Sequence, residues 1–301
     1  MESHDFAWAA GFFDGEGWAN RSGRGVQSRI NQAGPDGIPE VLTKFRQIVG
    51  VGRIKGPVIV DGKQPLYYWE ATSRSDLIDV VERIGPWLCA VKRAEFERTL
   101  DGPLPAQVWP GSMSEELAWA GGFFDGEGST YLEKHRTHAG YLVPRLYVPQ
   151  VAEVGIAAEL QRLKAALGGL GAISGLRRGK GKSKPYRRWR VSAPVDVHLG
   201  LHLLWPFIGH VKRTQAQCVL HVIDSQPDLP RGNPAFGVAG ARYCLRGHDK
   251  WNARIRPFKG RKKRRRSFDP LSAMYDLRPR VRAREEKQKA TAVRPSLSSV
   301  S

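Results

Sequence analysis

Two copies of one ten-residue stretch determine how this chain is organised: Trp8-Ala9-Ala10-Gly11-Phe12-Phe13-Asp14-Gly15-Glu16-Gly17 and Trp119-Ala120-Gly121-Gly122-Phe123-Phe124-Asp125-Gly126-Glu127-Gly128. They begin 111 residues apart and agree at nine of ten positions. The single difference exchanges one small residue, Ala10, for another, Gly121. The duplication predicts two similar halves, each with one acidic site at an equivalent place.

Each stretch has the features of a helix that ends in two glycines. In the first copy Ser3 can cap a helix that runs from about Asp5 to Phe13. Small residues share one side of this helix at three- and four-residue spacing, and a helix face without large side chains lets another backbone approach closely. This pattern indicates either a tight helix–sheet contact or a crossing of the two copies. The residues expected at the interface are Ala7, Ala10, Gly11, Ala118, Gly121 and Gly122.

The second acid of each stretch, Glu16 or Glu127, is expected at the end of its helix, because glycines flank it. A helix C-terminus carries partial negative charge, so a carboxylate there needs a positive partner. A divalent cation with oxygen ligands, Mg²⁺ first and Mn²⁺ as a substitute, would provide it. The ligand spacing of a calcium loop is missing, and no zinc spacing occurs within the repeats. A purely structural use of the glycines and acids stays open.

Beyond the motif the two halves remain in step. Trp69 matches Trp189 and Lys92 matches Lys212, both at an offset of 120 residues. Hydrophobic periodicity predicts the element order α-β-β-α-β-β-α-α in the first half, and the second half stays in step with it. We therefore expect a first repeat at residues 1–100, a linker at 101–113, a second repeat at 114–225 whose first helix begins at Ser114, and a linker with a basic tail at 226–301.

Charge is distributed unevenly along the 301 residues, whose net charge is +19. Residues 1–112 hold 13 Lys and Arg against 14 Asp and Glu, residues 113–225 hold 15 against 9, and residues 226–301 hold 20 against 6. A basic chain favours a polyanionic partner, nucleic acid before a membrane surface. No run of about 18 apolar residues occurs, so no membrane span is expected.

Several segments carry side chains suited to DNA. Polar residues along two predicted strands could read base edges in a groove, or could form a solvated strand face. They are Arg21, Gln27, Arg29 and Asn31. A basic hairpin in the second repeat suits phosphate contacts, with a solvated loop tip as the alternative. Its residues are Arg177, Arg178, Lys180, Lys182 and Lys184.

The tail contains the basic run Lys262, Lys263, Arg264, Arg265 and Arg266. This run could bind DNA non-specifically, act as an import signal, or belong to a disordered basic tail. Cys244 and His248 resemble the start of a small zinc ribbon, but a zinc site needs about four ligands and the second cysteine pair is absent. We therefore do not expect zinc.

The duplicated motif resembles the two signature helices of the single-chain LAGLIDADG homing endonucleases. The resemblance implies an α+β fold of two pseudo-symmetric αββαββα repeats, which form a saddle of two antiparallel four-stranded sheets. The signature helices cross at a pseudo-two-fold axis in such a monomer. The basic C-terminal tail lies outside this resemblance.

The family's functional residues carry over where this sequence matches. The resemblance implies that Glu16 and Glu127 are catalytic and bind the metal. Lys92 and Lys212 resemble the family's basic residue that polarises the attacking water, and Gln32 and Gln150 resemble polar residues at the active-site periphery. Asp14 and Asp125 do not occupy the family's metal position, and we expect them to be helix caps or outer residues.

The expected function is site-specific cleavage of double-stranded DNA, one phosphodiester per strand, at a long non-palindromic site, as in intron homing. The alternative is an intron-splicing maturase or a non-cleaving DNA-binding regulator with the same fold. The expected location is the cytoplasm or nucleoid of a prokaryote or phage-infected cell, and an organelle or the nucleus stays open.

Overall fold

The computed structural model describes residues 2–23, 25–134, 142–152, 155–178 and 184–224. Lys180 and Lys182 of the basic hairpin, the tail run at 262–266 and the residues Cys244 and His248 lie outside the described residues. Among the helices in the described ranges, none combines the length and the apolar character needed to cross a membrane.

The first half follows the predicted order of elements. It contains α1 (Ser3–Glu16), β1 (Gly17–Ser22), β2 (Gly25–Ala33), α2 (Glu40–Val49), β3 (Arg53–Val58), β4 (Leu66–Ala71), α3 (Arg74–Ile84), the short 3₁₀ helix η1 (Gly85–Trp87) and α4 (Ala90–Leu100).

The second half repeats this order after the linker. It contains α5 (Met113–Glu127), β5 (Ser129–Lys134), β6 (Leu142–Val151), α6 (Ala158–Ala166), β7 (Ala172–Ile173), β8 (Tyr186–Val191), α7 (Pro194–Leu204) and α8 (His210–Asp224).

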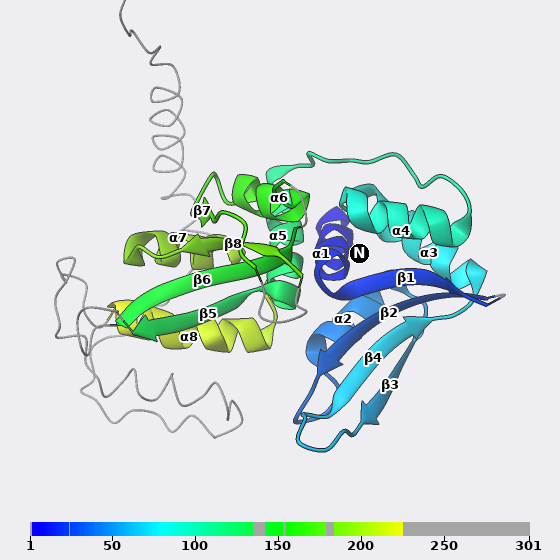
Figure 1. Ribbon diagram of the computed structural model, residues 1–301, viewed down its shortest axis with the longest axis horizontal. Coiled ribbons are helices and arrows are strands. Elements are labelled where there is room, and N and C mark those ends of the chain that lie inside the picture. The colour runs from blue at the N-terminus through cyan, green and yellow to red at the C-terminus, as the bar shows by residue number, and fades with distance from the viewer. Residues whose placement is uncertain (1, 24, 135–141, 153–154, 179–183, 225–301) are drawn as a thin grey trace, which may run out of the picture.

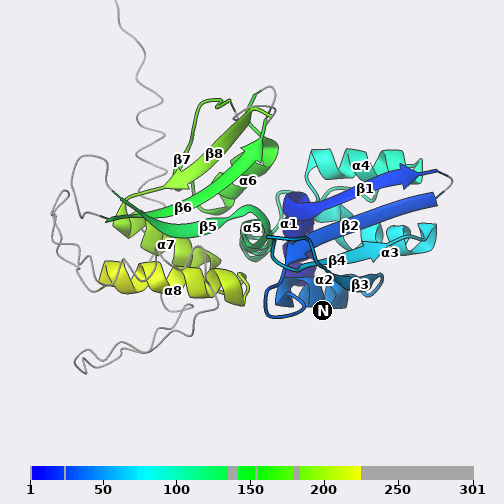
Figure 2. The ribbon, with the colours of Figure 1, turned by 60° about the horizontal axis from the view of Figure 1, so that its bottom comes forward.

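Each half forms one antiparallel four-stranded sheet, with strand order β1-β2-β4-β3 in the first and β5-β6-β8-β7 in the second. Helices α1 and α5 lie side by side between the two sheets (Figures 1 and 2). The predicted α+β architecture of two antiparallel sheets with flanking helices is therefore confirmed.

Both central helices begin slightly earlier than the sequence suggested. Helix α5 is capped by Ser112, not Ser114, because Glu115 stands three residues after Ser112 and completes a capping box with it. Helix α1 is capped in the same way by Glu2 and Asp5, so Ser3 is already helical. Both helices end where expected, at Glu16 and Glu127.

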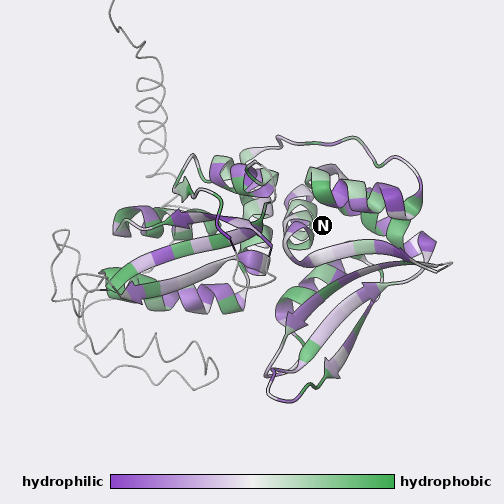
Figure 3. Cartoon of the chain, in the orientation of Figure 1, coloured by the Kyte–Doolittle hydropathy of each residue, from purple (hydrophilic) through white to green (hydrophobic). Residues whose placement is uncertain are grey.

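The strands alternate between a face that packs against helices and an open face. In β6, Leu142, Leu146 and Val148 are buried while their neighbours are only partly covered. Hydrophilic residues are accordingly interspersed along the strands of both sheets (Figure 3). Trp69 and Trp189 are fully buried at equivalent register positions, and each indole donates to a backbone carbonyl. Each sheet therefore has one side anchored in the core and one side open to a partner.

Helices α1 and α5 touch through their backbones. A Cβ atom built on Gly11 would lie 2.0 Å from the carbonyl oxygen of Trp119, and one on Gly122 would lie 1.9 Å from that of Trp8. No side chain fits in such a gap, so both positions require glycine. Ala7, Ala10 and Ala118 are completely buried. The expectation that Gly121 lies at the crossing was wrong. The side of Gly121 that lacks a Cβ faces Phe207, which precedes α8, and not α1.

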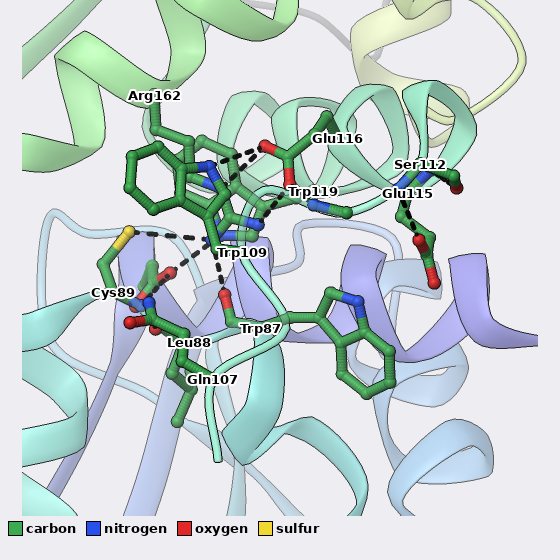
Figure 4. A network of polar contacts seen from close by, with 12 residues as sticks. Trp87, Leu88, Cys89, Gln107, Trp109, Ser112, Glu115, Glu116, Trp119 and Arg162 are labelled. Atoms are coloured by element: carbon green, nitrogen blue, oxygen red, sulfur yellow. Dashed lines mark hydrogen bonds and ion pairs between the residues drawn. The ribbon is translucent and has the colours of Figure 1, made fainter.

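A buried arginine adds a second connection between the halves (Figure 4). Arg162 of α6 is 3% exposed and makes a bidentate ion pair with Glu116 of α5, at 3.0 Å for both bonds. Its guanidinium also lies 4.3 Å from the ring centroid of Trp119 and donates to the carbonyl of Trp87 in the first half. A buried charge needs such complete pairing, so this network fixes α6 against the crossing.

Replacement of Gly122 by alanine tests the crossing. Alanine favours a helix over glycine by about 1 kcal/mol, yet here its methyl group would overlap the Trp8 carbonyl. We expect Gly122→Ala to lower the free energy of unfolding by about 1–3 kcal/mol, as overpacked cores do, in a urea titration. The control is Gly175→Ala, where a Cβ meets nothing within 4 Å. Equal stability of the two variants would contradict the close approach.

Candidate active site

Glu16 and Glu127 face each other where the crossing helices end. A Cβ on Gly15 would lie 3.2 Å from Cγ of Glu127, and one on Gly126 would lie 3.0 Å from Cγ of Glu16. Each glutamate therefore extends over the last glycine of the other helix. The crossing thus brings together two acids that are 111 residues apart in the sequence.

Burial disfavours the charged form of both carboxylates. The pKa of Glu127 is raised to about 7, mainly by burial and also by the neighbouring Glu16. Lys212 and Lys92 oppose this shift. Burial also raises the pKa of Glu16, which is opposed by a hydrogen bond from Gln32 and by Lys212. The two lysines therefore do not fully offset the effect of burial on the pair.

The two lysines lie near this pair but in unequal surroundings. Lys212 of α8 donates to the backbone carbonyl of Gly128, directly after Glu127. Burial lowers the pKa of Lys212, and Asp125, Glu16 and Glu127 oppose that shift. Lys92 of α4 instead forms an ion pair with Glu95, at 2.9 Å between Nζ and Oε1.

The two glutamines also differ. Gln32, near the end of β2, contacts Glu16. Gln150, near the end of β6, lies opposite Arg187 of β8 in the sheet register. Within the described part of the chain, no contact between Gln150 and Glu127 matches the one that Gln32 makes.

Asp14 and Asp125 form a reciprocal set of bonds across the crossing. The indole Nε1 of Trp119 donates to Asp14 Oδ2 at 2.8 Å, and that of Trp8 donates to Asp125 Oδ2 at 3.1 Å. Each aspartate also accepts the backbone N–H that precedes a lysine-bearing helix. Cys89 N lies 3.0 Å from Asp14 Oδ2, and Gly209 N lies 2.8 Å from Asp125 Oδ1.

These aspartates therefore hold the site together and do not face it. Each accepts a bond from the opposite central helix and one from the start of α4 or α8, where the positive end of the helix dipole favours a carboxylate. Burial nevertheless dominates and raises the pKa of Asp14 to about 7 and that of Asp125 to about 6. The expectation that both are capping or outer residues agrees with these contacts.

Solved structures with the same arrangement of elements are known. The LAGLIDADG meganuclease I-AabMI bound to uncleaved DNA matches over 82% of this chain and 99% of its own, at a TM-score of 0.58 and 17% identity. The LAGLIDADG meganuclease I-CpaMI bound to uncleaved DNA matches over 82% and 99%, at 0.57 and 15% identity. This chain has the LAGLIDADG meganuclease fold. No protein-family model and no curated protein matches the sequence.

The open face of the first sheet of this meganuclease fold carries most of the strand residues expected to contact DNA. Gln27, Arg29 and Asn31 alternate with the buried Ser28 and Ile30 along β2. The Arg29 guanidinium stacks 3.4 Å from the ring centroid of Tyr68, on the neighbouring strand β4. These side chains share one surface and are available to a ligand laid across the sheet.

Arg21 is not part of that face. Its Nε donates to the carbonyl of Thr99 at 3.1 Å, and its guanidinium lies 3.5 Å from Asp101. Thr99 belongs to α4, which packs on the helix side of β1. The expectation for Arg21 was wrong because side chains alternate along a strand, and its register places it on the same side as the buried Ala19.

The second sheet has basic residues that sequence reasoning missed. Arg145 of β6 and Arg188 and Arg190 of β8 lie on its open face, since the buried residues of both strands lie between them. Burial lowers the pKa of Arg190, and the charges of Arg145 and Arg188 add to this effect. The alternation of Arg188 and Arg190 around the buried Trp189 was the available signal. Arg177, Arg178 and Lys184 of the hairpin are exposed.

The site fits a hard divalent cation. Among the described residues, no group of three or more His, Cys, Asp and Glu side chains could hold a metal ion. Mg²⁺ does not need one, because it binds through one or two carboxylates and takes its other oxygens from water and substrate phosphate. Glu16 and Glu127 supply two such carboxylates, and burial raises the pKa of both.

The pKa of Asp14 predicts a pH dependence of stability. The folded protein keeps a proton on this carboxyl up to about pH 7, whereas the unfolded chain releases it near 3.8. Its stabilising contribution is therefore complete below about pH 4 and is lost as pH rises through 7. Measured by urea unfolding from pH 4 to 8, the stability of the wild type should fall relative to Asp14→Asn by a few kcal/mol.

The matched control for this experiment is Asp61→Asn, at an exposed turn position. It should follow the wild-type curve across the whole pH range. A constant difference between wild type and Asp14→Asn would show that Asp14 does not change its protonation in this window.

Proposed function

We propose that this protein is a site-specific, Mg²⁺-dependent endonuclease that cuts both strands of a long, non-palindromic DNA duplex. The observation that carries the proposal is the pair Glu16 and Glu127, which meet at the end of two crossing helices next to Lys212. A protein that only bound DNA would gain nothing from two half-buried carboxylates placed side by side. Their destabilising burial is explained if they bind a cation during a reaction.

Glu16 and Glu127 are the residues that would hold Mg²⁺. When bound, the ion lowers the pKa of a water ligand and stabilises charge on the phosphate. Lys212, close to both glutamates, adds a fixed positive charge where the phosphate becomes more negative in the transition state. Gln32 orients the carboxylate of Glu16.

The two open sheet faces supply a surface for the DNA. Side chains that project from antiparallel strands can enter a groove and contact base edges, while exposed basic side chains contact phosphates. The first face carries Gln27, Arg29 and Asn31 and the second carries Arg145, Arg188 and Arg190. Since the two faces differ in their polar residues, we propose that the two half-sites differ in sequence. The meganucleases I-AabMI and I-CpaMI were solved bound to DNA, which supports this partner.

Cleavage is tested on a duplex selected from a randomised double-stranded library by repeated binding to the protein in EDTA. A supercoiled plasmid that carries the selected duplex is then incubated with Mg²⁺ or with EDTA. We expect linear product with Mg²⁺ only. Glu16→Gln and Glu127→Gln should each reduce cleavage by on the order of a hundredfold or more, because several kcal/mol of charge stabilisation is lost.

Binding of the same duplex separates a loss of chemistry from a loss of folding. Both variants should bind with affinity close to wild type in EDTA, and the exposed Glu82→Gln should cut like the wild type. Tight binding without cleavage under Mg²⁺ or Mn²⁺ would contradict the nuclease and support a maturase or regulator on this fold.

A further inference from the structure

The two lysine-bearing helices differ in charge at the position three residues after the lysine. Lys92 and Lys212 are equivalent, and three residues later α4 has Glu95 where α8 has Gln215. The next residues after the lysines, Arg93 and Arg213, make matching bonds to the backbone of the preceding turn. The two helices therefore sit alike, and the difference in charge lies in equivalent surroundings.

Glu95 holds Lys92 directly. Its Oε1 lies 2.9 Å from Lys92 Nζ, and its Oε2 accepts the backbone N–H of Ala19 in β1 at 3.4 Å. Both side chains are largely covered, at 15% exposure for Lys92 and 19% for Glu95. A partly buried ion pair is weakly screened, so the carboxylate offsets much of the ammonium's field at neighbouring groups.

Gln215 does not replace this function. Its Oε1 is buried without a hydrogen-bond partner among the described residues, and so is Oγ1 of Thr130, which stands in β5 where Ala19 stands in β1. In the same part of the chain, no carboxylate oxygen lies within 4.0 Å of Lys212 Nζ, which bonds to the neutral carbonyl of Gly128. Lys212 therefore lacks a direct ion pair like that of Lys92, and its charge acts on Asp125 and on the two glutamates.

We propose that Glu95 is a positioning residue that holds Lys92 and offsets its charge, and that Gln215 leaves Lys212 without an ion pair from its own helix, so the two catalytic centres are unequal. The inference rests on the proposed endonuclease. The DNA strand served by Lys92 is cut more slowly, and nicked duplex accumulates before the linear product. One elementary charge about 10 Å away, at an effective dielectric constant of ~20, changes such a rate by on the order of tenfold.

The test exchanges the two residues. Cleavage of the selected duplex by the full-length protein in Mg²⁺ is followed with a different label on each strand, for the wild type, Glu95→Gln, Gln215→Glu and the double exchange. Glu95→Gln should speed the cut of the slow strand by on the order of tenfold and leave the other unchanged. Gln215→Glu should slow only the other strand, and the double exchange should reverse the strand preference.

The outcomes separate the two proposals. The scissile sequences differ between the strands, so the ratio of the two cleavage rates in the wild type is not itself the test. The test is how that ratio changes when residues 95 and 215 are exchanged. Variants that alter both strands equally, or neither, would overturn the unequal centres while the endonuclease stands. No cleavage of either strand by the wild type would overturn the endonuclease and this inference with it. Urea unfolding of each variant shows whether a lost rate reflects unfolding, which would affect both strands alike.

Discussion

The contact between the backbones of α1 and α5 is the constraint on which the rest of this structure depends. Gly11 and Gly122 leave no room for a side chain against the carbonyls of Trp119 and Trp8. Because the helices approach so closely, their last residues meet, and Glu16 and Glu127 come within reach of one another. If the helices moved apart by the width of a methyl group, the glutamates would no longer form a pair, even though each half could keep its own sheet and core.

The indole–carboxylate bonds connect that crossing to the lysines. Asp14 accepts from Trp119 of the opposite helix and from Cys89 at the start of α4, and Asp125 does the same with Trp8 and Gly209. Each aspartate thus links the two central helices to each other and also bonds to the start of the helix that carries Lys92 or Lys212. Burying two aspartates at raised pKa values costs stability. In return, the two aspartates hold α1, α5, α4 and α8 together at the ends of the central helices.

Much of this arrangement could be predicted from the sequence, because the signals are local. The duplicated motif, its small residues and its terminal glycines indicate two helices, a close contact and an acid at each end. Long-range partners have no such signal. Nothing in the periodicity around Asp14 points to Trp119. Arg21 was grouped with the groove residues because its polar character alone does not show which side of the strand it occupies. Arg145 was missed because its role depends on which strand lies beside β6.

The two halves have the same residues at the helix crossing and different residues on the open faces of the sheets. The glycines at the crossing, the tryptophans, the aspartates and the glutamates are the same in both copies, since a change in one would remove a contact that the other half shares. On the open faces, Gln27 and Asn31 of the first sheet have no amide counterparts among Arg145, Arg188 and Arg190 of the second. The lysine helices combine both tendencies, because Lys92 and Lys212 are the same while Glu95 and Gln215 differ. If, as proposed, this scaffold of two similar halves binds an asymmetric duplex, nothing requires its two lysine sites to be equal, and Glu95 and Gln215 are the residues at which they differ.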